Sequence, residues 1–189
     1  MKCLICSGRE FNLIWNDKIR SGRKKFTKHK EKIYQCFNCN LVFLNKKRKI
    51  LENSGLTRKL YNKDNSINEF FNFHNPRELK KLKFVKKHIS FKNKDVLESN
   101  CGAGIIINSL KKTSKITAGL DSLIYKKFLN KNKHLYFRDV EEIIKSKKKF
   151  DIILSLSEIE HKYNPILFLK NLKKIIKKNG FIVLRIPNF

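Results

Sequence analysis

The sequence predicts an α/β fold in which helices cover both faces of an open, mostly parallel sheet. From residue 95 onward, short apolar runs alternate with helix-length stretches, the pattern of strands joined by crossover helices. The first run ends in DVLESNCGAG (95–104), where two glycines lie between a strand and the start of a helix. Two pairs of cysteines before residue 45 indicate a small separate module ahead of the sheet.

Length and charge limit the possible functions. With 189 residues and 41% hydrophobic content, the chain can bury one substantial core and a small appended module. The net charge of +28 comes mostly from lysines spread over all segments, so it indicates either a well-solvated surface or a polyanionic partner such as RNA. No apolar run is long enough for a membrane span, and Met1 leads into charged, cysteine-containing sequence rather than a secretory leader. We therefore expect a cytoplasmic protein without a membrane span.

The cysteines before residue 45 form two CxxC pairs, Cys3 with Cys6 and Cys36 with Cys39. Two residues between thiolates let both sulfurs reach one tetrahedral ion, so the two pairs together predict a structural zinc site. Disulfides, which a reducing cytosol disfavours, and a redox-active CxxC are the alternatives. Within a zinc-binding module of residues 1–45, we expect the basic segment from Arg9 to Lys32 to form a hairpin or loop closed by the metal.

We expect residues 46–94 to form a helical connector. Apolar residues recur at helical spacing from Pro76 to Ile89, with the proline in a plausible first turn. The positions expected to pack on the sheet are Leu79, Leu82, Phe84, Val85 and Ile89.

Five strands are expected in residues 95–189. They are Asp95–Glu98, Ile116–Leu120, Leu135–Phe137, Phe150–Leu156 and Phe181–Ile186. The clearest helix runs from Asn164 to Lys178, with Pro165 at its start and Asn179-Gly180 as its stop signal. Its inner face is expected to carry Ile166, Leu167, Leu169, Leu172, Ile175 and Ile176.

Candidate site residues follow these strands at the edge where open α/β sheets bind ligands. Gly102 and Gly104 lack the Cβ atoms that would keep a ligand off the backbone of the helix start. Asp121 can accept hydrogen bonds from both hydroxyls of a ribose, or it can cap the following helix. Asp139 can likewise cap a helix or contact an adenine amino group. Cys101, inside the glycine-rich turn, is expected to pack.

These motifs resemble the class I S-adenosylmethionine-dependent methyltransferases over residues 95–187. VLESNCGAG is similar to the glycine-rich first motif of that family, and GLDSL is similar to its ribose motif. The longest similarity is FDIILSLSEIEHKYNPILFLKNLKKIIKKNGFIVLRIPN, which corresponds to the fourth strand through the fifth strand. With the four-cysteine module included, the chain resembles zinc-containing methyltransferases that modify nucleotide-linked sugars, including the sugar C-methyltransferases.

The resemblance implies a Rossmann-like domain over residues 95–189 that binds S-adenosylmethionine. It places Glu98, Gly102 and Gly104 around the methionine part of the cofactor and Asp121 at the ribose. Asp139 with Val140 would lie beside the adenine.

The resemblance also implies a catalytic pair. Glu160 and His161 match the position of the acid and base residues of the sugar C-methyltransferases. Histidine suits this role because its unperturbed pKa of about 6.5 lets it take a proton near neutral pH, and Glu160 could orient it. The alternative is that the pair only caps its strand and contacts the cofactor loop.

Two features depart from the resembled family. Asn100 stands where the first motif opens with glycine; asparagine tolerates a left-handed backbone, but its side chain would project where the cofactor passes. The family's last strands are missing after the fifth strand, so we expect an uncovered sheet edge that a partner chain could complete.

The sequence therefore predicts an S-adenosylmethionine-dependent methyltransferase that acts on a nucleotide-linked sugar or a cell-surface polysaccharide precursor. An RNA-directed methyltransferase or RNA-binding module is one alternative, favoured by the net charge and the cysteine module. A truncated, non-catalytic methyltransferase remnant is the other, favoured by Asn100 and the missing strands.

Overall fold

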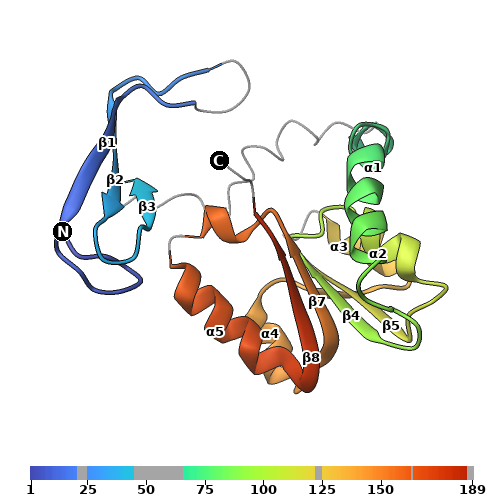
Figure 1. Cartoon of the computed structure of the whole chain (residues 1–189). Helices are drawn as coiled ribbons and strands as arrows, with labels where there is room; N and C mark the ends of the chain where they lie inside the picture. Colours follow the sequence, from blue (N-terminus) through green and yellow to red (C-terminus); the bar gives the residue numbers. More distant parts are fainter. Residues whose placement is uncertain (21–24, 45–65, 122–124, 163, 187–189) are drawn as a thin grey trace. The chain divides into compact units, whose positions relative to one another are not determined.

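The computed structural model describes residues 1–20, 25–44, 66–121, 125–162 and 164–186, with side chains from residue 72 onward in the third range. It divides into two compact units, Met1–Ile50 and Leu51–Phe189 (Figure 1). The first part of the expected connector (46–65), the end of the GLDSL motif (122–123) and the last residues of the long motif (187–188) lie outside the described residues.

The first unit contains a three-stranded antiparallel sheet in the order β1-β2-β3. β1 (Phe11–Asp17) pairs with β2 (Glu31–Cys36), and β2 pairs with β3 (Val42–Leu44). The β1–β2 pair confirms the hairpin expected between the two cysteine pairs.

The second unit contains a five-stranded parallel sheet in the order β6-β5-β4-β7-β8. This sheet, with its connecting helices, confirms the Rossmann-like α/β fold predicted from the sequence. Its elements, in chain order, are α1 (Ser66–Val85), β4 (Asp95–Ser99), α2 (Ile105–Leu110), β5 (Ile116–Leu120), α3 (Lys126–Lys131), β6 (Leu135–Phe137), α4 (Val140–Lys145), β7 (Phe150–Leu156), the 3-10 turn η3 (Ile159–His161), α5 (Pro165–Ile175) and β8 (Ile176–Arg185).

Helices cover both faces of this sheet (Figure 1). On one face, Leu82 of α1 and Ile106 of α2 belong to a buried cluster with Val96 of β4. On the other face, Phe168 of α5 belongs to a cluster with Leu97, the next residue of β4. The two-residue period of a strand thus assigns each β4 side chain to one helical layer. Among the helices that the structure describes, none combines the length and the hydropathy of a membrane span.

α1 begins earlier than the sequence pattern predicts. Its 20 residues place Pro76 inside the helix rather than in its first turn, which corrects the expected start. Proline has no backbone N–H, so the helix lacks one internal hydrogen bond at this point. We attribute the continuation of the helix to the burial of Leu82 and Val85 against the sheet.

Two helices bury different residues from those predicted. Leu79 and Phe84 of α1 are 38% and 65% exposed, and Leu167 of α5 is 52% exposed, so the expectation that they face the core is wrong. Phe84 lies two positions from buried Leu82, which is about 200° around the helix axis. Phe168 is buried in place of Leu167 because it lies four positions before buried Leu172 on the same face.

The α5–β8 junction also differs from the prediction. The helix ends at Ile175 and the strand begins at Ile176, so Asn179-Gly180 lies within the strand and is not the helix stop signal. The pairing of β7 with β8 is irregular there: Phe150 pairs with Ile176, but Ile152 pairs with Phe181. The four residues 177–180 of β8 therefore lie opposite the single residue Asp151 of β7.

A long-range ionic contact lies within this irregular stretch. Lys177 Nζ lies 2.7 Å from Asp95 Oδ2 of β4 and 2.9 Å from Asp151 Oδ2 of β7. A Cβ atom on Gly180 would lie 2.8 Å from the backbone oxygen of Asp151, so only glycine fits this close approach. The contact fixes the amino-terminal ends of three strands together.

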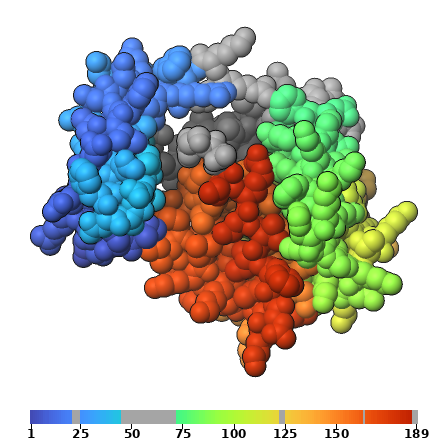
Figure 2. Space-filling view, viewed as in Figure 1, coloured from blue at the N-terminus to red at the C-terminus, as the bar shows by residue number. Residues whose placement is uncertain are grey.

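β8 forms one edge of the described sheet, since among the described strands it pairs only with β7. Its side chains Phe181 and Leu184 are exposed, as is Ile186 just beyond it. Figure 2 shows this strand (red) along the surface next to the green segment of α1. A partner chain at this edge stays a prediction.

One buried histidine predicts how stability depends on pH. His134 precedes β6, and its Nδ1 lies 2.7 Å from Thr117 Oγ1, whereas its buried Nε2 has no hydrogen-bond partner among the described residues. Burial, together with the charge of Lys111, lowers its pKa from 6.5 to about 4. The folded protein therefore keeps this imidazole neutral in a pH range where the unfolded chain protonates it.

We expect the free energy of unfolding to fall as the pH decreases from about 6.5 to about 4, and this contribution to level off below that. The loss should be at most about 3 kcal/mol, because one pKa unit corresponds to about 1.4 kcal/mol. Urea unfolding across this range should show a smaller slope for His134→Asn, while His88→Asn, at an exposed position, should keep the wild-type slope. Equal slopes for wild type and His134→Asn would contradict the assignment.

Candidate functional site

The strand order reverses between β4 and β7. The chain moves outward from β4 to β5 and β6, then returns to β7 and β8 on the other side. In open α/β sheets, ligands bind where the strand order reverses, at the carboxyl ends of the strands. Here these ends lead into the turn of residues 100–104 and the loop of residues 157–162.

The turn after β4 has three left-handed residues, Asn100, Gly102 and Gly104, with φ angles of 58°, 55° and 77°. Asn100 thus adopts the conformation that asparagine tolerates better than other non-glycine residues. Its backbone N–H donates to the Leu120 carbonyl at 2.8 Å, and the Gly102 N–H donates to Asp121 Oδ2 at 2.6 Å. The turn is therefore held by the end of the neighbouring strand β5.

Packing requires glycine at 104. A Cβ atom there would lie 2.7 Å from Leu129 Cδ2 and 3.0 Å from Ile107 Cγ1, so its absence allows α2 and α3 to approach closely. The missing Cβ atom at 104 thus serves helix packing, whereas the sequence predicts that it serves ligand approach. Cys101 is buried in the same cluster, which confirms that it packs.

Glu98 is a buried acid at the carboxyl end of β4. Two residues after Val96, it faces the α1 layer, and its Oε2 has no hydrogen-bond partner among the described residues. Burial, and then the charge of Glu78, raises its pKa well above the usual carboxyl value, although the Ile107 N–H and Lys81 act in the opposite direction. This carboxyl group would be stabilised in its ionised form by a cation bound beside it.

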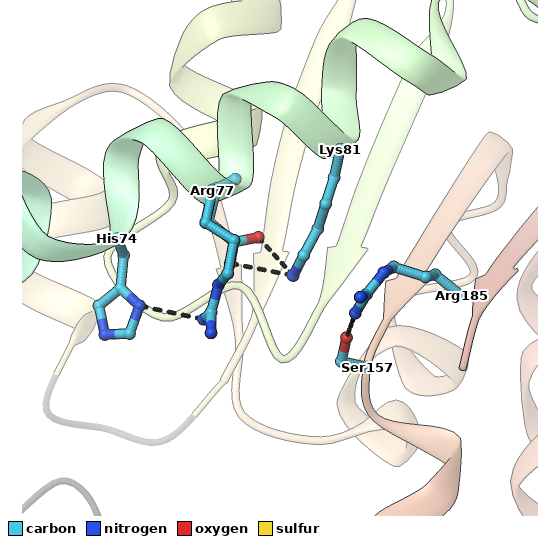
Figure 3. A network of polar contacts seen from close by, with 6 residues as sticks. His74, Arg77, Lys81, Ser157 and Arg185 are labelled. Atoms are coloured by element: carbon cyan, nitrogen blue, oxygen red, sulfur yellow. Dashed lines mark hydrogen bonds and ion pairs between the residues drawn. The ribbon is translucent and has the colours of Figure 1, made fainter. Parts of the chain in front are cut away.

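α1 supplies a polar network that the sequence did not indicate. Lys81 Nζ lies 2.9 Å from both Glu78 carboxylate oxygens, and Arg77 Nε lies 3.1 Å from Glu78 Oε1. Arg77 Nη2 also lies 3.1 Å from His74 Nδ1. Figure 3 shows His74, Arg77 and Lys81 projecting from the same helix. The i, i+3 spacing of Glu78 and Lys81 was the only local signal for it.

Asp121, which follows β5, connects the turn to β6. Besides accepting from Gly102, its N–H donates to the Phe137 carbonyl at 3.1 Å, and its carbonyl accepts from the Tyr136 hydroxyl at 2.9 Å. The described α3 has Tyr125 as its N-terminal cap, so Asp121 does not cap that helix. Its carboxylate instead lies at the glycine-rich turn, where a ribose contact was expected.

Asp139 caps α4. Its side chain accepts from the Glu142 N–H at 2.9 Å, and the pKa of Asp139 is lowered by this hydrogen bond and by Arg138, whose Nε lies 3.0 Å away. The capping alternative is therefore confirmed. Val140 is the first helical residue and is partly buried against the core. Adenine contacts by Asp139 and Val140 stay predictions.

Glu160 and His161 are exposed in η3, on the loop that follows β7. The buried acid of this loop is Glu158, which the sequence reading did not single out. Its carboxylate accepts from Ser155 Oγ at 3.1 Å and pairs with Lys162 Nζ at 2.9 Å. Glu158 thus anchors the loop that presents Glu160 and His161.

The end of β8 contributes a cation. Arg185 Nη1 donates to Ser157 Oγ, and the Ser157 N–H donates to the Arg185 carbonyl at 2.8 Å (Figure 3). Ser157 has a φ angle of 70°, so the chain turns sharply at the end of β7. The sequence offered one signal, the two-residue period that places Arg185 on the same side of β8 as Val183.

The four cysteines of the first unit gather into one cluster, with all four sulfurs within 4.8 Å of one another. Cys3 Sγ lies 3.6 Å from Cys39 Sγ, and Cys6 Sγ lies 3.5 Å from Cys36 Sγ. Sulfurs at about 2.3 Å from a tetrahedral ion are about 3.8 Å apart, so the spacing fits a metal site. Burial alone would raise the pKa of Cys3, but hydrogen bonds from the Cys6 and Ile5 backbone and from Cys39 bring it down to about 6.

Comparison with known proteins identifies the second unit. Residues 71–189 match the family model described as methyltransferase domain, which covers more than half of the chain. The chain belongs to this methyltransferase family. The prediction of a methyltransferase is thereby confirmed at the level of the family.

Named relatives match between about half and three quarters of this chain. A ubiquinone biosynthesis O-methyltransferase from Coxiella burnetii is 32% identical over 108 residues, 53% of this chain and 46% of the relative. One from Pelagibacter ubique is 30% identical over 151 residues, 76% and 58% of the two chains. A tRNA U34 carboxymethyltransferase from Nautilia profundicola is 31% identical over 127 residues, 62% and 42%. The chain spans about half the length of these relatives.

Solved structures agree on the fold of the methyltransferase. The N-methyltransferase NodS from Bradyrhizobium japonicum, in complex with S-adenosyl-L-homocysteine, has a TM-score of 0.53 at 16% identity, covering 70% of this chain and 71% of that chain. The DhpI complex with the same ligand also has a TM-score of 0.53, at 14% identity, covering 71% and 68%. Binding of S-adenosylmethionine by this chain and its specific resemblance to sugar C-methyltransferases stay predictions.

The buried carboxyl group of Glu98 predicts a stability effect in the methyltransferase without cofactor. Because its folded pKa is raised, stability is lost as the pH rises above the usual carboxyl pKa of about 4.5. Glu98→Gln cannot ionise, so it should be more stable than wild type at pH 8, with the difference shrinking toward pH 4.5. Urea unfolding measures this, with Glu141→Gln on the exposed side of α4 as the matched control. A Glu98→Gln variant that is less stable at pH 8 would contradict the prediction.

Proposed function

We propose that this methyltransferase transfers the methyl group of S-adenosylmethionine to a hydroxyl-bearing small molecule. The observation that carries the proposal is the position of Glu160 and His161, on the loop that leaves β7 beside the glycine-rich turn of β4. A base in this position can remove the hydroxyl proton as the bond to the methyl carbon forms. Glu158 acts as a positioning residue because its contacts with Ser155 and Lys162 hold the loop.

The residues around the turn fit the cofactor. The amino group of its methionine part is a cation that suits the unpartnered oxygen of Glu98, and Lys81 suits the carboxylate of the same part. Gly102 and Asn100 present a backbone shaped by β5, and Asp121 lies where the ribose is expected. When bound, the cofactor supplies an electrophilic sulfonium methyl group.

Two classes of acceptor are consistent with this site. The sequence resemblance favours a nucleotide-linked sugar or a related cell-surface precursor. The two O-methyltransferases among the relatives favour a hydroxyl-bearing precursor of ubiquinone. If a hydroxyl is the methylated group in either class, the same O–H proton must be removed, so the acceptor pocket, and not the catalytic pair, decides between them.

RNA is the second candidate substrate. It is favoured by the net charge of +28 and by the similarity to a tRNA U34 carboxymethyltransferase. Neutralised phosphates release counterions, so RNA binding would weaken steeply as salt increases. An affinity for tRNA that persists at physiological salt and exceeds that for heparin would favour this candidate over a small molecule.

We also propose that the cysteine cluster holds zinc as a structural ion. The support is a set of four thiol ligands at tetrahedral spacing, two of them buried, in a unit with a three-stranded sheet as its only described regular structure. Such small units depend on bound metal for stability because their hydrophobic core is small.

Purified full-length protein should contain about one zinc ion per chain by metal analysis, in keeping with four ligands for one ion. Cys36→Ser removes a buried ligand and should lower the zinc content, whereas Cys101→Ser should leave it unchanged because Cys101 packs in the other unit. Equal zinc content in wild type and Cys36→Ser would rule out this site.

Calorimetry with S-adenosyl-L-homocysteine tests the main proposal. Asp121→Ala should weaken binding by roughly tenfold to hundredfold, the cost of losing a charge-assisted hydrogen bond at the turn. Glu141→Ala, which removes an exposed carboxylate from α4, should bind like wild type. Thermal unfolding shows whether Asp121→Ala remains folded.

Calorimetry combined with a turnover assay separates cofactor binding from the chemical step. His161→Ala should bind S-adenosyl-L-homocysteine like wild type. Its rate of forming S-adenosyl-L-homocysteine from S-adenosylmethionine, with a nucleotide-linked sugar or a ubiquinone precursor as acceptor, should fall by about 100-fold or more. Failure of the wild-type protein to bind S-adenosyl-L-homocysteine would overturn the proposed function. Normal turnover by His161→Ala would remove only its catalytic role.

A further inference from the structure

Arg185 differs from the other described arginines of the second unit in what it contacts. Arg77 lies against Glu78 and Arg138 against Asp139, so both guanidinium groups pair with carboxylates. The only contact recorded for the Arg185 side chain among the described residues is with the neutral hydroxyl of Ser157. Its positive charge is therefore not compensated by a described carboxylate.

The position of Arg185 follows from the strand register. Arg185 pairs with Leu156 and lies two residues beyond Val183, which packs in the cluster under α1. Its side chain therefore faces the α1 layer at the carboxyl end of β8. Leu82 belongs to the same cluster, and Lys81 is its neighbour in α1. Figure 3 shows Arg185 pointing from β8, and Lys81 from α1, toward the region between these elements.

Arg185 is also separated from the methionine end of the expected cofactor site. Glu98 pairs with Leu154, which pairs with Val183, so Arg185 is two strands and two residues away from Glu98. With strands about 4.8 Å apart and about 3.3 Å per residue, the two backbone positions differ by about 12 Å. Arg185 is therefore not one of the residues expected to contact the methionine part of the cofactor.

Two hydrogen bonds join exposed Arg185 to Ser157, one between the backbones and one from the guanidinium. The backbone N–H of Ser157 binds the Arg185 carbonyl, and its hydroxyl binds Nη1. A guanidinium has five N–H donors in a planar fork, and this contact leaves the remaining donors for a ligand. A fork of this kind matches two oxygens of a phosphate or a carboxylate.

We propose that Arg185 binds an anionic oxygen group of the acceptor, with Ser157 as its positioning residue. This inference rests on the proposed function and narrows it, because it selects an acceptor with a phosphate or carboxylate group. A nucleotide-linked sugar carries such a group in its diphosphate. A neutral quinone precursor does not, and would leave the charge of Arg185 unmatched.

The test uses the full chain saturated with S-adenosyl-L-homocysteine, titrated with pyrophosphate and, separately, with acetate at constant ionic strength. Arg185→Gln should weaken pyrophosphate binding by about tenfold or more, since charge-assisted contacts of this kind are worth at least one factor of ten. Arg185→Lys should weaken it less, because it keeps the charge but loses the fork. Ser157→Ala should give an intermediate loss.

Lys173→Gln is the matched control. It removes one positive charge from an exposed position on α5, on the other face of the sheet, and should change pyrophosphate binding by less than about twofold. Equal losses in Arg185→Gln and Lys173→Gln would show a diffuse effect of net charge and overturn the inference. A loss of S-adenosyl-L-homocysteine affinity in Arg185→Gln, with pyrophosphate binding unchanged, would assign Arg185 to the cofactor and also overturn it.

The two proposals fail in different ways. If wild type does not bind S-adenosyl-L-homocysteine, the proposed function fails, and pyrophosphate titration of the protein alone still tests Arg185. If the cofactor product binds but no anion binding depends on Arg185, only the anionic acceptor is rejected. Stronger Arg185-dependent binding of acetate than of pyrophosphate would identify a carboxylate as the group.

Discussion

The site depends on hydrogen bonds from the turn after β4 to the end of β5. The Asn100 N–H binds the last residue of β5, and the Gly102 N–H binds the carboxylate of Asp121, the next residue. Three left-handed residues in five positions are unfavourable for an isolated chain, even with two glycines. The turn therefore acquires its shape only when the parallel sheet has formed. Since Asp121 also binds both residues 136 and 137 at the end of β6, three strand ends are fixed as one unit.

The sequence predicted the turn and four of the five strands of the second unit because their signals are local, whereas β8 begins five residues before the expected strand. Parallel strands are buried on both faces and appear as short apolar runs, and Phe150–Leu156 was placed correctly for this reason. The end of α5 could not be placed from Asn179-Gly180, because Lys177 is held by Asp95, 82 residues away in the sequence. Similarly, the local signals of Arg185 and Lys81, a strand period and an i, i+3 spacing, do not distinguish them among 44 basic residues or relate them to each other. Only the packing of Val183 and Leu82 in one cluster relates them.

Glu98 illustrates the conflict between stability and binding at this site. An acid buried with an unpartnered oxygen disfavours folding at neutral pH, and nearby Glu78 adds to this effect. The same environment favours a bound cation more strongly than an exposed carboxylate could, because the interaction takes place away from water. A site of this kind is stabilised by its ligand, so cofactor binding and folding of the turn region are thermodynamically linked.

Local pairing is more informative here than the net charge. With 16 acidic residues against 44 basic ones, most cations of this chain cannot have a carboxylate partner, so an unpaired lysine on the surface indicates little. The acids of the second unit are nevertheless used at defined points: Glu158 holds Lys162, and Asp95 and Asp151 hold Lys177. Arg185 is different because its backbone and side chain are both fixed, yet by groups that carry no charge. Ordering a long side chain costs conformational entropy, and one hydrogen bond to a hydroxyl offsets this cost only partly. A bound anion that accepts the remaining guanidinium hydrogen bonds would offset the rest of this entropy cost. The overall charge of +28 does not, because it does not act on one side chain.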